Sequence, residues 1–141
     1  MAEIGTIASV VIKNETGRYL LVQEAKKAVR GLWNIPGGHV DEGETLQEGA
    51  VREALEETGL KVKIIDDSPL LAEIIPGTQL SYRPFMAHII SGEPTASPGE
   101  TLNVRWFTFT EIKALEKENK LRQPLVINAI AEAERYAHNR H

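Results

Sequence analysis

Three glutamates near the middle of the chain are the residues whose type and spacing point to chemistry. Glu53, Glu56 and Glu57 stand at positions i, i+3 and i+4, so a helix would place them on one face. Like charges at this spacing repel one another on an ordinary surface helix. Because closely spaced carboxylate oxygens suit hard divalent cations, we interpret the three side chains as a site for Mg²⁺ or Mn²⁺.

The residues around these glutamates predict a helix with defined ends. Thr45 and Glu48 have the spacing of a capping box, which places the start of the helix. Gly59 follows the last helical positions, where a left-handed residue is favoured. The helical repeat predicts a buried face opposite the glutamates, at Val51, Ala54, Leu55 and Thr58.

The segment from Gly38 to Leu60 resembles the signature of the Nudix hydrolases. In that signature a glycine, five residues and a glutamate are followed by seven residues, Arg-Glu, an aliphatic residue, any residue, Glu-Glu, any residue, glycine and an aliphatic residue. The matching positions, with the small Ala54 as the softest match, are Gly38, Glu44, Arg52, Glu53, Ala54, Glu56, Glu57, Gly59 and Leu60. The signature covers a small part of the chain, so it indicates the chemistry better than the substrate.

The resemblance implies a hydrolase that cleaves a phosphoanhydride bond with water activated by a divalent metal ion. The implied ligands of Mg²⁺ or Mn²⁺ are the side chains of Glu53, Glu56 and Glu57 and the backbone carbonyl of Gly37. Arg52 is similar to the family arginine that orients a signature glutamate rather than touching the substrate. The remaining signature residues, which would brace the loop–helix–loop, are Gly38, Glu44 and Gly59.

Many Nudix enzymes use a further glutamate, distant in sequence, as a base or an extra metal ligand. The loop over residues 92–102 offers Glu93 and Glu100. We favour Glu100 as the catalytic base because it shortly precedes Val104–Phe107, which resembles a late strand of the family. The alternative is that Glu100 is an ordinary carboxylate of an exposed loop.

Residues that bind the substrate are harder to predict, because isolated basic side chains are usually surface residues. The candidates for phosphate contacts are Arg30, Arg83, Lys26 and Lys27. Trp33, Tyr82 and Phe85 could stack on a base, but aromatic residues at strand positions more often belong to the core.

The segment Leu121–Val126, together with Trp33-Asn34, resembles a bacterial Nudix phosphatase subgroup. Members of that subgroup act on nucleoside tri- and diphosphates and on a pyrophosphorylated thiamine precursor. Arg122 lies just before Pro124, which suits the first position of a helix. Arg122 is therefore a further substrate-binding candidate, because the start of a helix favours anions such as a terminal phosphate.

The elements that must position these residues are a mixture of strands and helices. The predicted strands are 6–13, 19–23, 61–65, 70–75, 80–90 and 103–109, with the first two joined as a hairpin and a charged loop over 24–30. Thr110 is predicted to cap a short helix, and Pro124 to start a terminal helix with the apolar stripe Leu125, Ile130, Ala133 and Ala137. This mixture favours an α/β fold with a mixed sheet covered by helices. The resemblance implies the Nudix α/β/α sandwich, with its loop–helix–loop beside the sheet.

Length and composition narrow the class of protein. A chain of 141 residues indicates one domain over residues 1–141. The absence of cysteine excludes disulfides, thiolate zinc sites and a cysteine nucleophile. The net charge of −4 argues against a nonspecific nucleic-acid partner. No long apolar run or signal-peptide pattern is present, so we expect a cytoplasmic protein without a membrane partner.

The leading functional prediction is hydrolysis of a nucleoside di- or triphosphate, or a related small diphosphate, by a monomer or homodimer. A pyrophosphatase for ADP-ribose or another nucleotide sugar is the alternative enzyme. A third possibility is a non-catalytic Nudix-like domain that senses a nucleotide, but the intact signature argues against it. The missing basic patch disfavours RNA 5′ ends as substrate.

Overall fold

The strand β1 (Thr6–Ile12) lies at the centre of the fold, and its residues from Ala8 to Ile12 are buried. In the computed structural model, which describes residues 5–139, β1 lies inside a mixed sheet. The order is β4 (Gly37–His39), β1, β7 (Ser81–Ser91) and β5 (Lys61–Ile64), with β6 (Glu73–Ile74) also paired to β7. Only the β1–β7 pair of this sheet is parallel.

A second, antiparallel sheet has the order β3 (Trp33–Asn34), β2 (Tyr19–Glu24) and β8 (Thr101–Phe107). The turn between β1 and β2 forms, but the predicted hairpin is wrong: after one bridge between Lys13 and Tyr19 the two strands enter different sheets. In those sheets β1 pairs with β4 and β7, while β2 pairs with β3 and β8. Both β1 and β2 therefore have hydrogen-bonded backbone partners along their two edges.

The helices begin where side chains can cap them. α1 (Leu46–Thr58) starts after Thr45 with the predicted capping box and ends at the left-handed Gly59. α2 (Phe109–Lys117) is capped by Thr108 rather than by the predicted Thr110. The reason is Glu111, which lies three residues after Thr108 and completes a second capping box.

The C-terminal helix α3 (Leu125–Asn139) follows Pro124, as predicted. Leu125, Ile130 and Ala133 are buried as expected, while the side chain of Ala137 lies outside those described. The predicted charged loop contains a short 3₁₀ helix, Lys27–Val29 (η1), and the predicted strand over 70–75 is reduced to β6. No helix in the described part of the chain is long and apolar enough to cross a bilayer.

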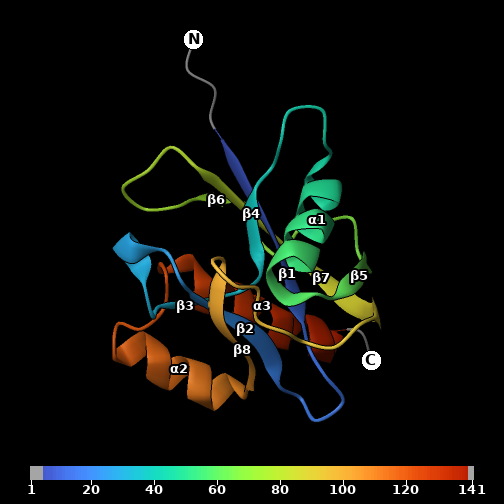
Figure 1. The fold of residues 1–141 in the computed structure, drawn as a ribbon. Coiled ribbons are helices and arrows are strands. Elements are labelled where there is room, and N and C mark those ends of the chain that lie inside the picture. The colour runs from blue at the N-terminus through green and yellow to red at the C-terminus, as the bar shows by residue number, and fades with distance from the viewer. Residues whose placement is uncertain (1–4, 140–141) are drawn as a thin grey trace.

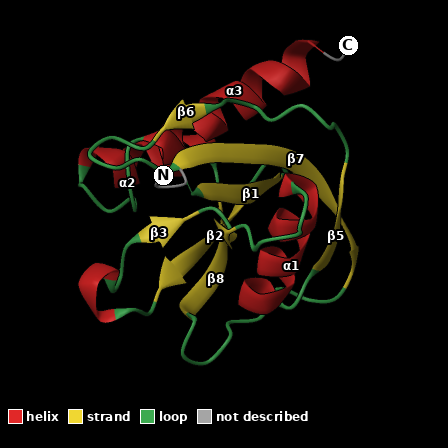
Figure 2. Cartoon of the chain, turned by 90° about the horizontal axis from the view of Figure 1, so that it is seen from above, coloured by secondary structure: helices red, strands yellow, loops and turns green. Residues whose placement is uncertain are grey.

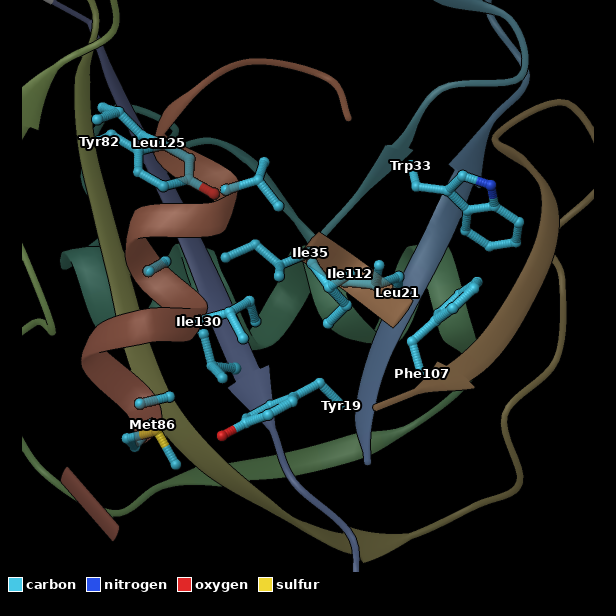
Figure 3. Close-up of a cluster of buried hydrophobic side chains, with 14 of the residues drawn as sticks. Tyr19, Leu21, Trp33, Ile35, Tyr82, Met86, Phe107, Ile112, Leu125 and Ile130 are labelled. Atoms are coloured by element: carbon cyan, nitrogen blue, oxygen red, sulfur yellow. The ribbon is translucent and has the colours of Figure 1, made fainter. Parts of the chain in front are cut away.

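Helices cover both faces of the larger sheet, which is the expected α/β/α arrangement (Figures 1 and 2). Side chains of β1 point alternately to the two faces of the sheet. Val10 packs in the apolar cluster between the sheet and α1, and Val11 packs in the cluster between the sheet and α3. Figure 3 shows the α3-side cluster, in which Trp33 and Phe107 meet edge to face with ring centroids 4.8 Å apart. Trp33 therefore belongs to the core.

The buried face of α1 differs from the predicted one. Leu55 is 51% exposed, so its predicted place in the core is wrong, whereas Ala50, Ala54 and Thr58 are buried. Small side chains let the helix lie close to β1 and β4, and the helix is turned so that Glu57 also points inward. The carboxylate of Glu57 is therefore buried along with the small side chains of the helix.

We predict that Ile130→Ala lowers the free energy of unfolding by about 2–5 kcal/mol, because it leaves a cavity between α3 and the sheet. The matched deletion Leu55→Ala, on the exposed side of α1, should change it by about 0.5 kcal/mol or less. Urea denaturation of both variants measures the difference. Equal losses would show that Leu55 is packed in solution.

Candidate active site

The C-terminal half of α1 borders a cleft of about 400 Å³ whose walls come from both sheets. Its acidic lining residues are Glu24, Asp41, Glu53, Glu56, Glu57 and Glu100. Its other polar and basic lining residues include Lys26, Asn34, His39, Tyr82, Arg122 and Gln123. The structure therefore brings together the predicted glutamates of the signature and the predicted Glu100, which is distant from them in sequence.

Arg52 connects the loop before α1 to the glutamates on the helix. Its Nε and Nη2 donate to the two carboxylate oxygens of Glu44, at 2.7 and 3.0 Å. Its Nη1 donates to Glu53 at 3.0 Å and to Glu56 at 3.1 Å, and Nη2 also donates to the carbonyl of His39 at 3.0 Å. The hydrogen bond from Arg52 lowers the pKa of Glu44. These contacts fit positioning roles for Arg52 and Glu44.

Glu57 is the most enclosed carboxylate of the cleft, with 8% of its surface exposed. Its Oε1 accepts a hydrogen bond from the backbone N–H of Gly37 at 2.9 Å. Burial raises the pKa of Glu57 to about 8, and the charges of Glu53, Glu24 and Glu100 add to the rise, against the effect of the Gly37 hydrogen bond. The charged groups that act on Glu57 are thus carboxylates, and within the described part of the chain none of these influences comes from a positive charge that would stabilise its ionised form.

Two consecutive glycines give the cleft its shape. A Cβ on Gly37 would lie 2.6 Å from the carbonyl oxygen of Ala8, so β4 can pair this closely with β1 only with glycine there. A Cβ on Gly38 would instead collide with the carboxylate of Glu53. Gly37 therefore allows β4 to approach the backbone of β1, and Gly38 leaves room for the carboxylate of Glu53.

The side chains of the cleft fit a hard divalent cation by their chemistry. Most of its charged groups are carboxylates, and oxygen ligands favour Mg²⁺ or Mn²⁺. Burial raises the pKa of Glu53 too, with Arg52 opposing the rise and Glu56 and Glu100 adding to it. A cation among these groups would relieve their mutual repulsion.

The carboxylates are not arranged as a finished coordination sphere. Within residues 5–139, no three acidic or histidine side chains are grouped closely enough to hold a metal ion. Glu57 faces the N–H of Gly37, and Glu53 and Glu56 face Arg52. The metal-ligand roles of Glu53, Glu56, Glu57 and the Gly37 carbonyl therefore stay predictions.

The loop before β8 and the end of β2 supply two further carboxylates. Of the two glutamates considered as the base, Glu100 lines the cleft and Glu93 does not, and the catalytic role of Glu100 stays a prediction. The sequence predicts Glu24 in a charged loop, but Glu24 ends β2 and lines the cleft, with only 17% of its side chain exposed. Burial raises the pKa of Glu24, while Asn34 and Arg122 counteract the rise. A glutamate directly after an apolar strand was the signal for this residue.

The predicted substrate-binding arginines separate into two groups. Arg122 lines the cleft, with its Nε 3.7 Å from Glu24. Arg30 is exposed and donates to the carbonyl of Ala25, so it lies outside the cleft. Arg83 also lies outside, because side chains alternate along β7 and its neighbour Tyr82 faces the cleft. The placement thus supports a substrate contact for Arg122 alone among the three.

The sequence over residues 4–128 matches the NUDIX domain family. This match spans most of the chain, and it contains the glutamate helix, the glycine pair and both sheets. The protein therefore belongs to the Nudix family.

Similar proteins are named hydrolases. A Bacillus subtilis protein named "Putative 8-oxo-dGTP diphosphatase" is 34% identical over 116 residues, which cover 82% of this chain and 74% of that protein. A Caenorhabditis elegans protein named "Putative nudix hydrolase 1" is 34% identical over 110 residues, 76% of this chain but only 29% of the worm protein. The solved NUDIX hydrolase from Nitrosomonas europaea superposes with a TM-score of 0.79 at 26% identity, covering 94% of this chain and 89% of that one. The chain is a Nudix hydrolase.

We predict that Arg52→Gln lowers the free energy of unfolding by about 1–3 kcal/mol, because charge-assisted hydrogen bonds to Glu44, Glu53 and Glu56 are lost together. Arg135→Gln is the control: among the described residues this arginine pairs with Glu132 on the surface of α3, and its loss should cost about 0.5 kcal/mol or less. Chemical denaturation at pH 7 compares the two. An equal loss of unfolding free energy in Arg135→Gln would show that Arg52 stabilises the fold no more than an ordinary surface arginine.

Alanine at the two glycines should separate folding from activity. Gly37→Ala should lower the free energy of unfolding by about 2 kcal/mol or more, because its Cβ meets the backbone of β1. Gly38→Ala should stay within about 1 kcal/mol of the parent yet lose at least tenfold in turnover, because its Cβ displaces the mobile end of Glu53. Denaturation and a phosphate-release assay measure both. Full activity in Gly38→Ala would contradict the role of the Glu53 position.

Proposed function

We propose that the cleft hydrolyses a phosphoanhydride bond of a nucleoside di- or triphosphate, or of a related small diphosphate, with Mg²⁺ or Mn²⁺. The observation that carries the proposal is the lining of the cleft, where Glu53, Glu57 and Glu100 share one space with the cations Lys26 and Arg122. Carboxylates suit the metal, and the two cations suit the negative charge of a phosphate chain. We expect the enzyme to act in the cytoplasm as a monomer or homodimer.

The residues divide the work of cleavage among them. Bound Mg²⁺ or Mn²⁺ would neutralise charge on the phosphate oxygens and lower the pKa of the attacking water. Glu53, Glu56 and Glu57, with the carbonyl of Gly37, would hold the ion. Arg52 would keep Glu53 and Glu56 in place through the hydrogen bonds described above. Arg122, which lines the same cleft, would orient the phosphate chain.

Glu100 would act as the general base. The water oxygen attacks phosphorus, its proton passes to the Glu100 carboxylate, and the anhydride P–O bond breaks so that the leaving phosphate keeps the bonding electrons. Glu100 suits this step because it is exposed at the cleft, where it can reach solvent after each turnover. Glu24 also lines the cleft, but its side chain is engaged with Asn34 and Arg122.

A nucleoside phosphate is the favoured substrate because the two stretches that resemble the bacterial phosphatase subgroup lie side by side. Backbone hydrogen bonds join β3 to the segment before α3. The N–H of Trp33 donates to the carbonyl of Lys120, and the N–H of Arg122 donates to the carbonyl of Trp33, both at 2.8 Å. The two stretches that resemble the bacterial phosphatase subgroup thus form one wall of the cleft. The diphosphatase name of the Bacillus subtilis relative agrees with this substrate class.

The test is a panel of nucleoside tri- and diphosphates, ADP-ribose, dinucleotides and the thiamine-precursor diphosphate, with Mg²⁺ or Mn²⁺ and with the metal chelated. We expect metal-dependent turnover of nucleoside tri- or diphosphates, lost at least 100-fold in Glu57→Gln and at least tenfold in Glu100→Gln. Glu93→Gln, which removes the same charge from the same loop outside the cleft, should keep its rate within about twofold.

Separate assays for orthophosphate and pyrophosphate identify the bond that is cleaved. Orthophosphate from tri- and diphosphates would support the phosphatase subgroup, and pyrophosphate from triphosphates would support a nucleotide pyrophosphohydrolase. AMP released from ADP-ribose alone would move the substrate to the nucleotide-sugar class. A folded protein that turns over nothing on the panel would contradict the proposal.

A further inference from the structure

The loop over residues 92–100 is attached to α1 through the last carbonyl groups of the helix. An α-helix leaves its last four carbonyls without partners inside the helix. The N–H of Thr95 donates to the carbonyl of Thr58 at 2.8 Å. The hydroxyl of Thr101, which directly follows the loop, donates to the carbonyl of Glu57 at 3.3 Å. The loop, which passes the end of α1 in Figure 1, therefore caps the helix that carries the glutamates.

The hydroxyl of Thr101 connects the helix to the loop. Thr101 is the first residue of β8 and is only 4% exposed. Its Oγ1 donates to the carbonyl of Glu57 and accepts from the N–H of Ser97 at 2.9 Å. A hydroxyl has one hydrogen to donate and lone pairs that accept, so it can make both hydrogen bonds at once. One buried oxygen thus joins Glu57 to the middle of the loop.

The turn that carries Glu100 closes on the same loop residue. The carbonyl of Ser97 accepts from the N–H of Glu100 and from the N–H of Thr101, both at 2.9 Å. The backbone of Glu100 is therefore tied to Ser97, and the Thr101 hydroxyl ties Ser97 to Glu57. A continuous chain of hydrogen bonds leads from the backbone of Glu57 to the backbone of Glu100.

A glycine brings the other end of the loop against the helix. Gly92 has a φ of 101°, and a Cβ there would lie 2.6 Å from the carbonyl oxygen of Gly59, the residue that ends α1. The loop therefore contacts the end of the helix where it begins, at Gly92, and where it finishes, at Thr101. A side chain carried by this loop has its position set by these attachments.

Glu57 and Glu100 act on each other across the cleft that both line. The negative charge of Glu100 adds to the burial that raises the pKa of Glu57. Glu57 is enclosed, whereas Glu100 is exposed, so Glu100 is held through its backbone rather than by packing of its side chain. The contacts of the loop therefore decide where the carboxylate of Glu100 lies relative to that of Glu57.

We propose that Thr101 is a positioning residue of the reaction: its hydroxyl seats the loop over residues 92–100 on the end of α1 and so fixes the placement of Glu100 relative to Glu57. Thr101 is buried rather than part of the cleft lining, so it acts through these two glutamates and not on the substrate. The inference rests on the proposed function in one respect, because Glu100 is taken to be the base.

Two substitutions at Thr101 separate its hydroxyl from its shape. Thr101→Val removes the hydroxyl and keeps the branched side chain, and Thr101→Ser keeps the hydroxyl and removes a methyl group. Thr58→Val is the matched control, because Thr58 is also buried, but its hydroxyl bonds to the carbonyl of Ala54 and the N–H of Leu60 rather than to the loop. Each valine removes one buried hydroxyl, so both should lower the urea midpoint of unfolding by comparable amounts.

Amide hydrogen exchange followed by NMR tests the attachment of the loop without any substrate. The N–H of Ser97 loses its acceptor in Thr101→Val, so we expect it to exchange about tenfold faster or more in this variant. In Thr101→Ser and Thr58→Val its exchange should stay within about threefold of the parent.

Steady-state kinetics on the nucleotide that the parent turns over best test the consequence for catalysis. Thr101→Val should lower kcat about tenfold and leave KM within about twofold, because the base is displaced while the groups that bind substrate remain. Thr101→Ser and Thr58→Val should keep kcat within about threefold. In a Glu100→Gln background, Thr101→Val should cause no further loss of kcat, because the two changes remove the same contribution.

Unchanged exchange of Ser97 in Thr101→Val would show that the hydroxyl does not seat the loop. Full kcat in Thr101→Val, an equal loss in Thr58→Val, or a loss that adds to that of Glu100→Gln would each overturn the positioning role. A parent that hydrolyses nucleotides but gives any of these results keeps the proposed function and loses this inference. A parent that hydrolyses nothing contradicts the proposed function and the positioning of a base with it, and the exchange of Ser97 then shows only whether Thr101 holds the loop.

Discussion

Repulsion among the carboxylates of one cleft is the constraint on which the rest of the structure depends. Burial raises the pKa of Glu24, Glu53 and Glu57, and the negative charge of Glu100 adds to each rise. Unpaired charges in a protein interior are costly. The chain opposes this cost with Arg52 at Glu53, Arg122 at Glu24 and the backbone N–H of Gly37 at Glu57. A site of this kind persists only if the surrounding elements hold it firmly.

That firmness comes from the centre of the larger sheet. β1 is covered on both faces, and Gly37 lets β4 lie directly against it, so the strand that leads into the loop before α1 is anchored to the centre of the sheet. The capping box at Thr45 then sets where α1 begins, and the contacts of Arg52 set how the loop and the helix face each other.

Local patterns in the sequence predicted the parts of this arrangement that neighbouring residues determine. The capping box, the left-handed Gly59 and the gathering of Glu53, Glu56 and Glu57 on one helix follow from spacing alone. The position of Glu100 at the cleft follows from the loop that leads into β8, whereas its role as the base stays a prediction. These features need only the period of a helix or the direction of a strand.

The remaining features depend on contacts between distant segments. Two apolar strands joined by a turn read as a hairpin, but nothing in either strand specifies that β1 pairs with β7 and β2 with β8. Leu55 is outside because two alanines, not a leucine, lie against the sheet, and size alone does not reveal this.

The pairing of distant strands also governs how the chain reaches its native state. Thr6 pairs with Ser81 and Tyr19 with Phe107, so neither sheet can close until most of the polypeptide exists. Folds dominated by such distant contacts form slowly, because long loops must be ordered before those contacts stabilise them. During synthesis β1 and β2 would leave the ribosome as apolar strands with unpaired edges, the condition under which nascent chains aggregate or recruit chaperones. The vulnerable interval in the life of this enzyme therefore precedes its first turnover.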